Sequence, residues 1–190
     1  MTQAFVLGNG VSRQAIDLHK LQQQGAIYGC NALYRDFVPD VLVATDKPIS
    51  EQIQHSNYAL TNKFYTRNPI YGLGAIRIPE DWWKYSSGPT AVALAAEHGY
   101  NTIYLLGFDL GPTQDNKFNN IYADTEFYKK STDVPTYTIN WVNQIQEIIK
   151  KFQTTQFIRV LGPTSAAIKN LENIANLLQT PLLNFQNCYK

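Results

Sequence analysis

The stretch FVLGNGVSRQAI, residues 5–16, carries the pattern that decides the fold. It begins with an apolar run typical of a buried strand, and the glycine-flanked Asn9 that follows marks a tight turn. Residues 12–24 then place apolar side chains at helical spacing, so the sequence predicts strand, turn and helix in succession. This order is typical of the first unit of a parallel sheet. This turn alone does not show whether it binds a phosphate or is only a tight corner. The residues that follow the other predicted strands are needed to distinguish the two interpretations.

The same alternation continues along the chain, with apolar runs followed by helical patterns. It predicts one α/β domain over residues 1–190, with a mainly parallel sheet and helices on both faces. The predicted later strands are residues 26–31, 41–46, 102–109, 157–162 and 181–185, and the predicted later helices are residues 48–56, 86–100, 137–152 and 165–178. Two segments have no clear periodicity: residues 58–85 are predicted to be irregular, and residues 110–135 are a polar, turn-rich lid segment or a disordered one.

Composition excludes several classes of protein. Sixteen basic against fifteen acidic residues, with no basic cluster, give no field to attract nucleic acid. The beginning of the chain lacks the features of a signal peptide, and no apolar run is long enough to span a bilayer. We therefore expect a soluble, cytoplasmic protein, and the sequence leaves a homo-oligomer open.

Cysteines and histidines give no sign of a metal or redox site. Cys30 lies in an apolar run and is predicted to be a small buried side chain, and it forms no C-x-x-C motif with Cys188. The three histidines lie on predicted helices without a partner at metal-ligand spacing, which predicts surface positions for His19, His55 and His98.

Polar residues follow four of the predicted strands, and ligands of open parallel sheets bind at the carboxyl ends of strands. These residues are Asn9, Asn31, Asp46 and Asp109. The predicted helix that begins with Ser86, Ser87 and Gly88 adds an exposed N-terminus at which an anion is favoured. Each signal alone also has a plain structural interpretation as a turn residue or a helix cap. Together they predict a small-molecule site at this edge of the sheet.

The first turn does not match the common nucleotide motifs. Gly8 and Gly10 supply the first two glycines of G-x-G-x-x-G, but Arg13 occupies the third position, and the acidic residue expected about 20 positions later is missing. NAD and FAD are therefore not expected as cofactors. The chain also lacks a P-loop and a G-x-S-x-G nucleophile elbow.

The strand ends resemble those of the bacterial sialyltransferases that build host-like lipooligosaccharide. The resemblance rests on GNGVS from Gly8 to Ser12, CN at residues 30–31, SSG at residues 86–88, IYLLGFD at residues 103–109 and YAD at residues 122–124. It implies a single Rossmann-like domain, a CMP-linked sugar as donor and no required cofactor. The donor-binding residues that it implies are Asn9, Asn31, Ser87, Gly88 and Tyr122, with Tyr128 as a looser match.

The chain departs from this family at the general base. Those transferases use a histidine near the helix that follows the lid, and the corresponding stretch TYTINWVNQ, residues 136–144, has none. Two interpretations stay open. Either another group such as Asp124 or Asp133 is the base, or the chain does not transfer sialic acid.

A second resemblance is to the archaeal-type 6-hydroxymethylpterin pyrophosphokinases. It rests on PDVLVATD, residues 39–46, followed downstream by SSG and GFDLG. It implies that Asp46 and Asp109 hold Mg²⁺ for phosphoryl transfer from ATP. A third alternative is a non-catalytic relic of the fold that binds a nucleotide or a protein.

Overall fold

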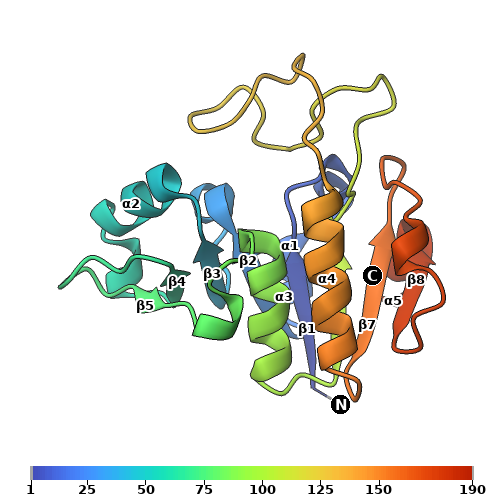
Figure 1. The fold of residues 1–190 in the computed structure, drawn as a ribbon, viewed down its shortest axis with the longest axis horizontal. Coiled ribbons are helices and arrows are strands. Elements are labelled where there is room, and N and C mark those ends of the chain that lie inside the picture. Colours follow the sequence, from blue (N-terminus) through green and yellow to red (C-terminus); the bar gives the residue numbers. More distant parts are fainter. Residues whose placement is uncertain (1, 190) are drawn as a thin grey trace.

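The computed structural model describes residues 2–189. Within them, eight strands form one sheet in the order β5-β4-β3-β2-β1-β6-β7-β8, and every neighbouring pair is parallel (Figure 1). The strands are β1 (Gln3–Leu7), β2 (Ala26–Cys30), β3 (Val41–Ala44), β4 (Phe64–Thr66), β5 (Ile76–Arg77), β6 (Thr102–Leu106), β7 (Gln156–Leu161) and β8 (Leu177–Pro181). The predicted α/β fold with a parallel sheet is confirmed.

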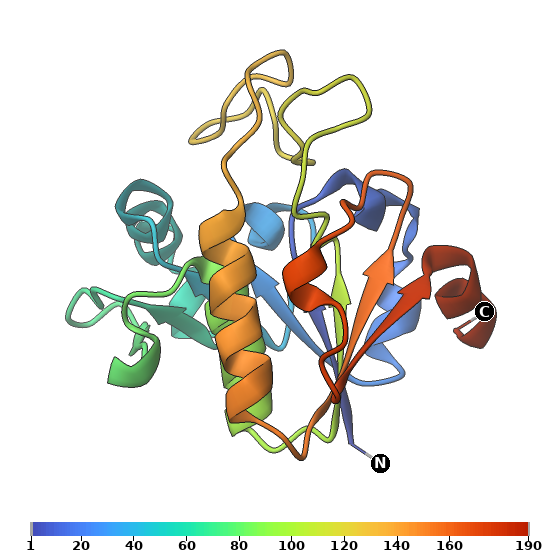
Figure 2. The same cartoon turned by 45° about the vertical axis from the view of Figure 1, so that its right-hand side comes forward.

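Five α-helices cover both faces of the sheet, as predicted. They are α1 (Leu18–Gln22), α2 (Lys47–His55), α3 (Ser87–Glu97), α4 (Ile139–Lys151) and α5 (Leu182–Cys188). Helices α3 and α4 lie on one face, and α1, α2 and α5 pack on the other (Figure 2). None of the helices in the described residues is both long and apolar enough to cross a membrane.

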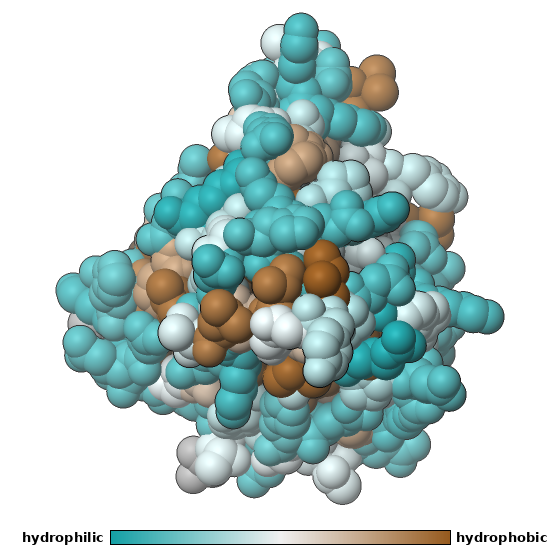
Figure 3. All heavy atoms as spheres, turned by 90° about the vertical axis from the view of Figure 1, so that its left-hand side faces the viewer, coloured by the Kyte–Doolittle hydropathy of each residue, from teal (hydrophilic) through white to brown (hydrophobic). Residues whose placement is uncertain are grey.

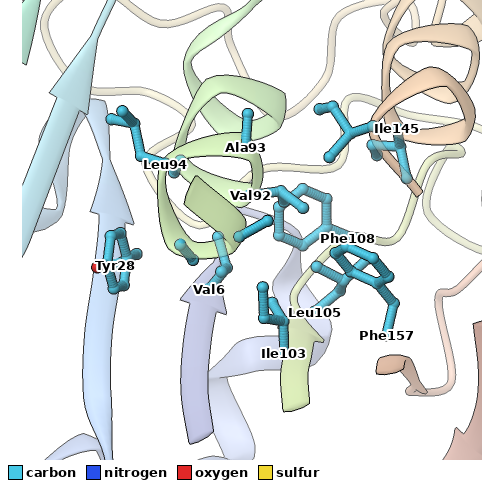
Figure 4. Close-up of a cluster of buried hydrophobic side chains, with 14 of the residues drawn as sticks. Val6, Tyr28, Val92, Ala93, Leu94, Ile103, Leu105, Phe108, Ile145 and Phe157 are labelled. Carbon is cyan, nitrogen blue, oxygen red and sulfur yellow. The ribbon is translucent and has the colours of Figure 1, made fainter. Parts of the chain in front are cut away.

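Strand β1 shows how the sequence forms the two cores. Its side chains alternate between faces, so Ala4 and Val6 pack in the core under α3 and α4, whereas Phe5 and Leu7 pack in the other. Because both faces are covered, all four of these side chains are buried, and the strand is apolar after its first residue, Gln3. Figure 4 shows Val6 of β1 beneath Val92 of α3, with Phe108 and Phe157 nearby.

Helix α3 is buried on nearly all sides because it packs on β1, β2 and β3 and lies beside α4 (Figure 1). The run from Ala91 to Ala96 contains four alanines, whose small side chains allow the helix to approach the strands closely. This packing fixes the position of the first turn of α3 at the carboxyl edge of the sheet.

The strand order places a topological switch point between β1 and β6. From β1 the chain extends the sheet in one direction through β5, and it then returns to add β6, β7 and β8 on the other side of β1. The connections that leave β1 and β6 therefore diverge, and they open a crevice at the carboxyl ends of these strands. The architecture is Rossmann-like.

The predicted long helix over residues 12–24 is wrong. The chain forms a 3-10 helix at Val11–Ala15, becomes extended at Ile16 and starts α1 only at Leu18. The side chain of Asp17 accepts hydrogen bonds from the backbone N–H groups of His19 and Lys20, and this N-cap begins a new helix there.

The last two predicted elements are also wrong. Residues 165–176 are irregular apart from a 3-10 turn at Lys169–Leu171, and residues 177–178 begin strand β8. Asn173 has a left-handed backbone with φ of 57°, which a helix excludes. Residues 182–185, predicted to continue a strand, belong to α5. The helix forms because Leu182, Phe185 and Tyr189 are spaced to place their side chains on one face of it, and all three pack in the core on that side of the sheet.

Residues 58–85 contribute more regular structure than predicted. Strands β4 and β5 lie within this segment and extend the sheet beyond β3. They span only three and two residues, too few for a period-2 pattern to be recognised.

The lid segment, residues 110–135, contains no helix or strand, as the turn-rich sequence predicts. It projects from the carboxyl edge of the sheet at the top of Figures 1 and 2. Figure 3 shows that its visible surface is largely hydrophilic.

Candidate functional site

A cavity of about 340 Å³ opens at the carboxyl edge of the sheet, over the switch point. The ends of β1, β2 and β6 line it together with the first turns of α3 and α4, and the lid segment contributes further residues. Of the residues that the sequence predicts for a site, those lining this cavity are Gly8, Asn9, Gly10, Asn31, Asp46, Ser86, Ser87, Gly88, Asp109 and Tyr128. The cavity therefore unites residues from six separate segments of the chain.

The two glycines of the first turn are required by close packing against β6. A Cβ atom on Gly8 would lie 2.5 Å from the carbonyl oxygen of Gly107, and one on Gly10 would lie 2.5 Å from the carboxyl carbon of Asp109. The N–H groups of Gly8 and Gly10 donate to the carbonyls of Leu106 and Gly107, at 2.8 and 2.9 Å. This turn is thus a tight corner between two strands, and these two N–H groups are not free for a phosphate.

Asn9 and Asn31 follow the neighbouring strands β1 and β2 and both line the cavity. Each has a side-chain oxygen that is buried without a hydrogen-bond partner. Asn31 also has a left-handed backbone, with φ of 52°. Asparagine is one of the few residue types besides glycine that adopts this conformation readily. The two oxygens are unsatisfied acceptors on residues that line the cavity at the switch point.

Asp109 is buried and its carboxylate is saturated by protein donors. One oxygen accepts from the Ser12 hydroxyl and from Ser165 Oγ at 3.2 Å. The other accepts from the Ser12 N–H at 3.1 Å and from Thr164 Oγ1 at 2.6 Å. Ser12 does not line the cavity itself, but it donates two hydrogen bonds to the Asp109 carboxylate. Because its lone pairs are in use, the Asp109 carboxylate is a structural link between the β1 turn and the loop after β7.

Arg159 supports the same strand end from β7, and the sequence analysis did not single it out. The guanidinium is completely buried and donates to the carbonyl oxygens of Phe108, Asp109 and Ala166, each at 3.0 Å. Burial lowers the pKa of Arg159 to about 10, and the Asp109 carboxylate acts in the opposite direction. A lone arginine inside an apolar strand run is the only sequence signal for this residue.

The first turn of α3 is held in place by hydrogen bonds to the end of β3 and to α4. The Ser87 hydroxyl accepts from the backbone N–H of Thr45 at 2.9 Å, and the Ser86 N–H donates to Gln144 Oε1 at 3.0 Å. Ser87 therefore joins α3 to the end of β3 and does not cap the helix, for which Ser86 is the N-cap residue. The turn is presented to the cavity as a rigid unit.

Asp46 is the other carboxylate of the lining, and it is exposed. It is the N-cap residue of α2, yet its side chain makes no capping hydrogen bond. No cluster of three or more His, Cys, Asp or Glu residues with the spacing of a metal site occurs in residues 2–189. Since Asp109 is saturated, the pair Asp46 and Asp109 is not arranged as a magnesium site.

Two lid tyrosines approach the strand ends. The hydroxyl of Tyr128, which lines the cavity, accepts the backbone N–H of Ala32 at 3.2 Å. Tyr122 is buried behind it, with the two ring centroids 5.7 Å apart. The lid is further joined to the β1 turn because Ile121 N–H donates to Asn9 O and Val11 N–H donates to Asn119 Oδ1, both at 2.9 Å.

The two predicted bases, Asp124 and Asp133, do not line the cavity. Asp124 is exposed and accepts from the N–H of Ser131 at 3.0 Å, and this hydrogen bond lowers the pKa of the carboxyl. Asp133 accepts from the N–H of Lys130 at 3.0 Å. Both carboxylates therefore order turns of the lid.

The cysteine and histidine predictions are confirmed. Cys30 is buried, and burial raises the pKa of its thiol to about 12, so it is a neutral lining group at physiological pH. His19, His55 and His98 are all exposed. The lining also includes Phe118, Lys129 and Trp141, which the sequence analysis did not select because nothing in their local pattern relates them to strand ends.

Comparison with known proteins gives no relative on which to base a function. No protein-family model, no curated protein and no solved structure matches the chain. Its relationship to other proteins therefore rests on architecture alone, and the chain is a single parallel α/β sheet domain of Rossmann-like character.

Proposed function

We propose that the cavity binds a nucleotide-activated sugar, with a cytidine nucleotide as the carrier, and that the protein transfers the sugar to an acceptor. The observation that carries this proposal is the pair of buried, unpartnered oxygens of Asn9 and Asn31. A buried acceptor without a donor costs about 1–3 kcal/mol. A ligand that donates to both oxygens removes this cost, and hydroxyl and amino groups are such donors.

Aromatic side chains in the lining suit the flat faces of a base or a sugar. Tyr128 and Phe118 come from the lid, and Trp141 comes from the first turn of α4. Stacking of a base on an aromatic ring contributes about 1–3 kcal/mol. Aromatic rings beside unsatisfied acceptors are the combination that a nucleoside or a sugar requires.

The resemblance to the bacterial sialyltransferases supports cytidine as the nucleoside. Residues from four of its five anchor segments, 8–12, 30–31, 86–88 and 103–109, line this one cavity. The sequence likeness and the cavity thus concern the same residues.

In the proposed reaction, a hydroxyl oxygen of the acceptor bonds to the anomeric carbon of the sugar. The bond between that carbon and the phosphate oxygen breaks, and CMP leaves with the electron pair. Asp46 is the lining carboxylate best suited to take the hydroxyl proton, because its side chain is exposed and accepts no hydrogen bond from residues 2–189. Asp109 is already saturated, and Asp124 and Asp133 do not line the cavity.

A thermal-shift series tests the proposal and its alternatives. The ligands are CMP, CMP-sialic acid, UDP, GDP and ATP, each with and without Mg²⁺. At 100 times its Kd a ligand adds about 2.7 kcal/mol of stability, which raises the Tm by about 5–10 °C in a domain of this size. We expect a shift with the cytidine ligands that is independent of metal.

The variant Asn31→Ala removes one acceptor and should abolish most of this shift. Asn57→Ala is a matched control because Asn57 also has a left-handed backbone, with φ of 62°, but does not line the cavity. A shift with ATP that requires Mg²⁺ and Asp46 would instead identify a pyrophosphokinase. The absence of any shift would leave only the non-catalytic interpretation.

A further inference from the structure

We infer that Arg13, which lies behind the cavity lining, makes the site prefer a phosphorylated nucleotide over the free nucleoside. The inference rests on the proposed function and adds the source of the charge that recognises the phosphate. The resemblances described above assign no role to this residue. In the sequence it occupies the position where dinucleotide-binding proteins have the third glycine.

The buried charges around the strand ends do not balance. Three charged side chains are buried in residues 2–189: Arg13, Asp109 and Arg159, with exposed fractions of 4%, 2% and 0%. All three belong to segments that meet at the carboxyl edge of the sheet. One carboxylate against two guanidinium groups leaves one positive charge without a buried counter-charge. Burying such a charge is costly unless a partner compensates it.

The uncompensated charge is that of Arg13. Arg159 donates to three backbone carbonyls and to Gln179 Oε1, and Asp109 is its neighbour. Arg13 donates through one terminal nitrogen to the Tyr122 hydroxyl at 3.3 Å, and its Nε is buried with no partner. No ion pair within 4.0 Å includes Arg13 in the described part of the chain. Asp36 also interacts with the Tyr122 hydroxyl and raises its pKa, but the Asp36 side chain is exposed to solvent.

Arg13 is directly behind residues that line the cavity. Its Cβ lies 3.0 Å from where a Cβ on Gly107 would be, and Gly107 belongs to the lining. The guanidinium is 5.9 Å from the centre of the Tyr122 ring, which packs on Tyr128. Its positive charge also opposes the rise in the pKa of the thiol of Cys30, another lining residue. Arg13 therefore lies next to the lining residue Gly107, and its guanidinium lies on the Tyr122 ring that packs against the lining residue Tyr128.

The ionisable groups at the cavity surface do not remove this imbalance. Asp109 also lines the cavity, and its negative charge is the one already set against the two buried guanidinium groups. Asp46 and Lys129 carry opposite charges, and both are exposed to solvent. Solvent and salt screen exposed charges strongly and screen a buried one much less. The buried charges of Arg13, Arg159 and the lining carboxylate Asp109 therefore sum to +1, and this net charge favours an anion in the cavity.

The test compares the affinities of cytidine, CMP and inorganic phosphate, measured by calorimetry. The proteins are the natural chain, Arg13→Lys, Arg13→Met and Arg13→Gln, the last two removing the charge with different side chains. Arg77→Met is the matched control, because Arg77 is exposed on β5 and stacks on Trp83 away from the cavity. Thermal unfolding of each variant identifies those that fold.

We expect the natural chain and Arg77→Met to bind CMP at least tenfold more tightly than cytidine, a ratio of the size that one nearby buried charge produces. Arg13→Lys should keep most of this ratio, and the folded neutral variants should bring it close to one without weakening cytidine. Equal affinity for cytidine and CMP in the natural chain, or a ratio unchanged in a neutral variant, would overturn the inference while the proposed nucleoside site remains. Phosphate binding that depends on Arg13, without cytidine or CMP binding, would show an anion site at Arg13 but would contradict both the nucleotide preference and the proposed function. Binding of neither CMP nor phosphate would overturn the inference.

Discussion

At the residue scale, Asp109 shows how a strand-end carboxylate can be structural. Its position after β6 suggested a ligand residue, and so did the second resemblance. In the structure its two oxygens accept four hydrogen bonds from Ser12, Thr164 and Ser165. These three residues come from two loops that are far apart in the sequence. The carboxylate thereby fixes the corner that contains Asn9.

Replacing Asp109 with asparagine should destabilise the protein strongly. The amide nitrogen cannot accept hydrogen bonds, and the change leaves the buried Arg159 without its neighbouring negative charge. We expect a loss of about 3 kcal/mol in the free energy of unfolding by urea. The control Asp81→Asn breaks only the surface pair with Lys151 and should cost less than about 1 kcal/mol. If the Asp109 variant is as stable as the natural chain, the structural role is wrong.

At the element scale, the lid segment is ordered by its contacts with the strand ends. It contains no helix or strand, and yet its residues contact the β1 turn and the turn after β2. Tyr128 joins it to Ala32, directly beside Asn31. The position of the lid is thus coupled to the residues that we assign to the ligand.

Removing the hydroxyl of Tyr128 tests this coupling. In Tyr128→Phe the ring remains packed against Tyr122, but the buried N–H of Ala32 loses its acceptor. We expect a loss of about 1–3 kcal/mol of stability, faster hydrogen exchange in residues 110–135 and faster dissociation of CMP. The control Tyr137→Phe changes a side chain with 81% exposure and should alter none of these. Unchanged exchange in Tyr128→Phe would show that other contacts order the lid.

Helix α5 is a second element whose role can be tested. The Phe185 ring lies 6.2, 5.4 and 4.7 Å from the ring centres of Phe5, Tyr104 and Tyr189. Phe185→Ala should therefore cost about 3 kcal/mol. On the same helix, Leu183→Ala truncates a side chain with 67% exposure and should cost less than about 0.5 kcal/mol. Chemical unfolding measures the loss in the free energy of unfolding for both variants. Equal losses would show that α5 does not pack as described.

The sequence predicts the strands of this fold better than its short helices. Buried parallel strands read as apolar runs, so β1, β2, β3, β6 and β7 can be recognised without tertiary information. Residues 182–188 also begin with an apolar run, and only the packing of Phe185 against three aromatic rings makes them a helix. Two of these rings, Phe5 and Tyr104, are far from Phe185 in the sequence, so a local sequence pattern does not predict the contact.

The same limit applies to the candidate site. Strand-end asparagines are predictable because parallel strands place their carboxyl ends together, and Asn9 and Asn31 do line one cavity. Arg159 and Trp141 could not be selected, because their relevance depends on how β7 and α4 pack. The lid aspartates Asp124 and Asp133 were selected for their charge, and only the structure shows that each instead orders a turn.

At the scale of the whole molecule, the protein should lose stability in alkaline solution. Burial raises the pKa of Tyr58, Tyr85 and Tyr122 to about 12, and the Cys30 thiol also to about 12; at Tyr85 the neighbouring Glu147 adds to the effect. The unfolded chain releases these protons near pH 9 to 10, but the folded chain retains them to about pH 12. The unfolded state therefore binds fewer protons in this window, and stability falls as the pH rises through it.

Urea unfolding at pH 7, 9, 10 and 11 measures this dependence. We expect the contribution of these groups to the free energy of unfolding to be nearly constant from pH 7 to 9 and to decrease progressively above pH 9. Tyr122→Phe and Cys30→Ala should each make the decrease less steep, because each removes one group that ionises preferentially in the unfolded chain. A stability that increases above pH 10 would contradict the burial of these side chains.

The central claim is that the oxygens of Asn9 and Asn31 form a ligand site at the switch point. The most direct measurement is a titration with CMP in which NMR follows the side-chain amide resonances of Asn9, Asn31 and the control Asn57. The account predicts saturable shifts of the first two resonances without Mg²⁺ and no shift of the third. If CMP causes no shift of Asn9 or Asn31 up to millimolar concentration, the site does not bind this nucleotide and the claim is wrong.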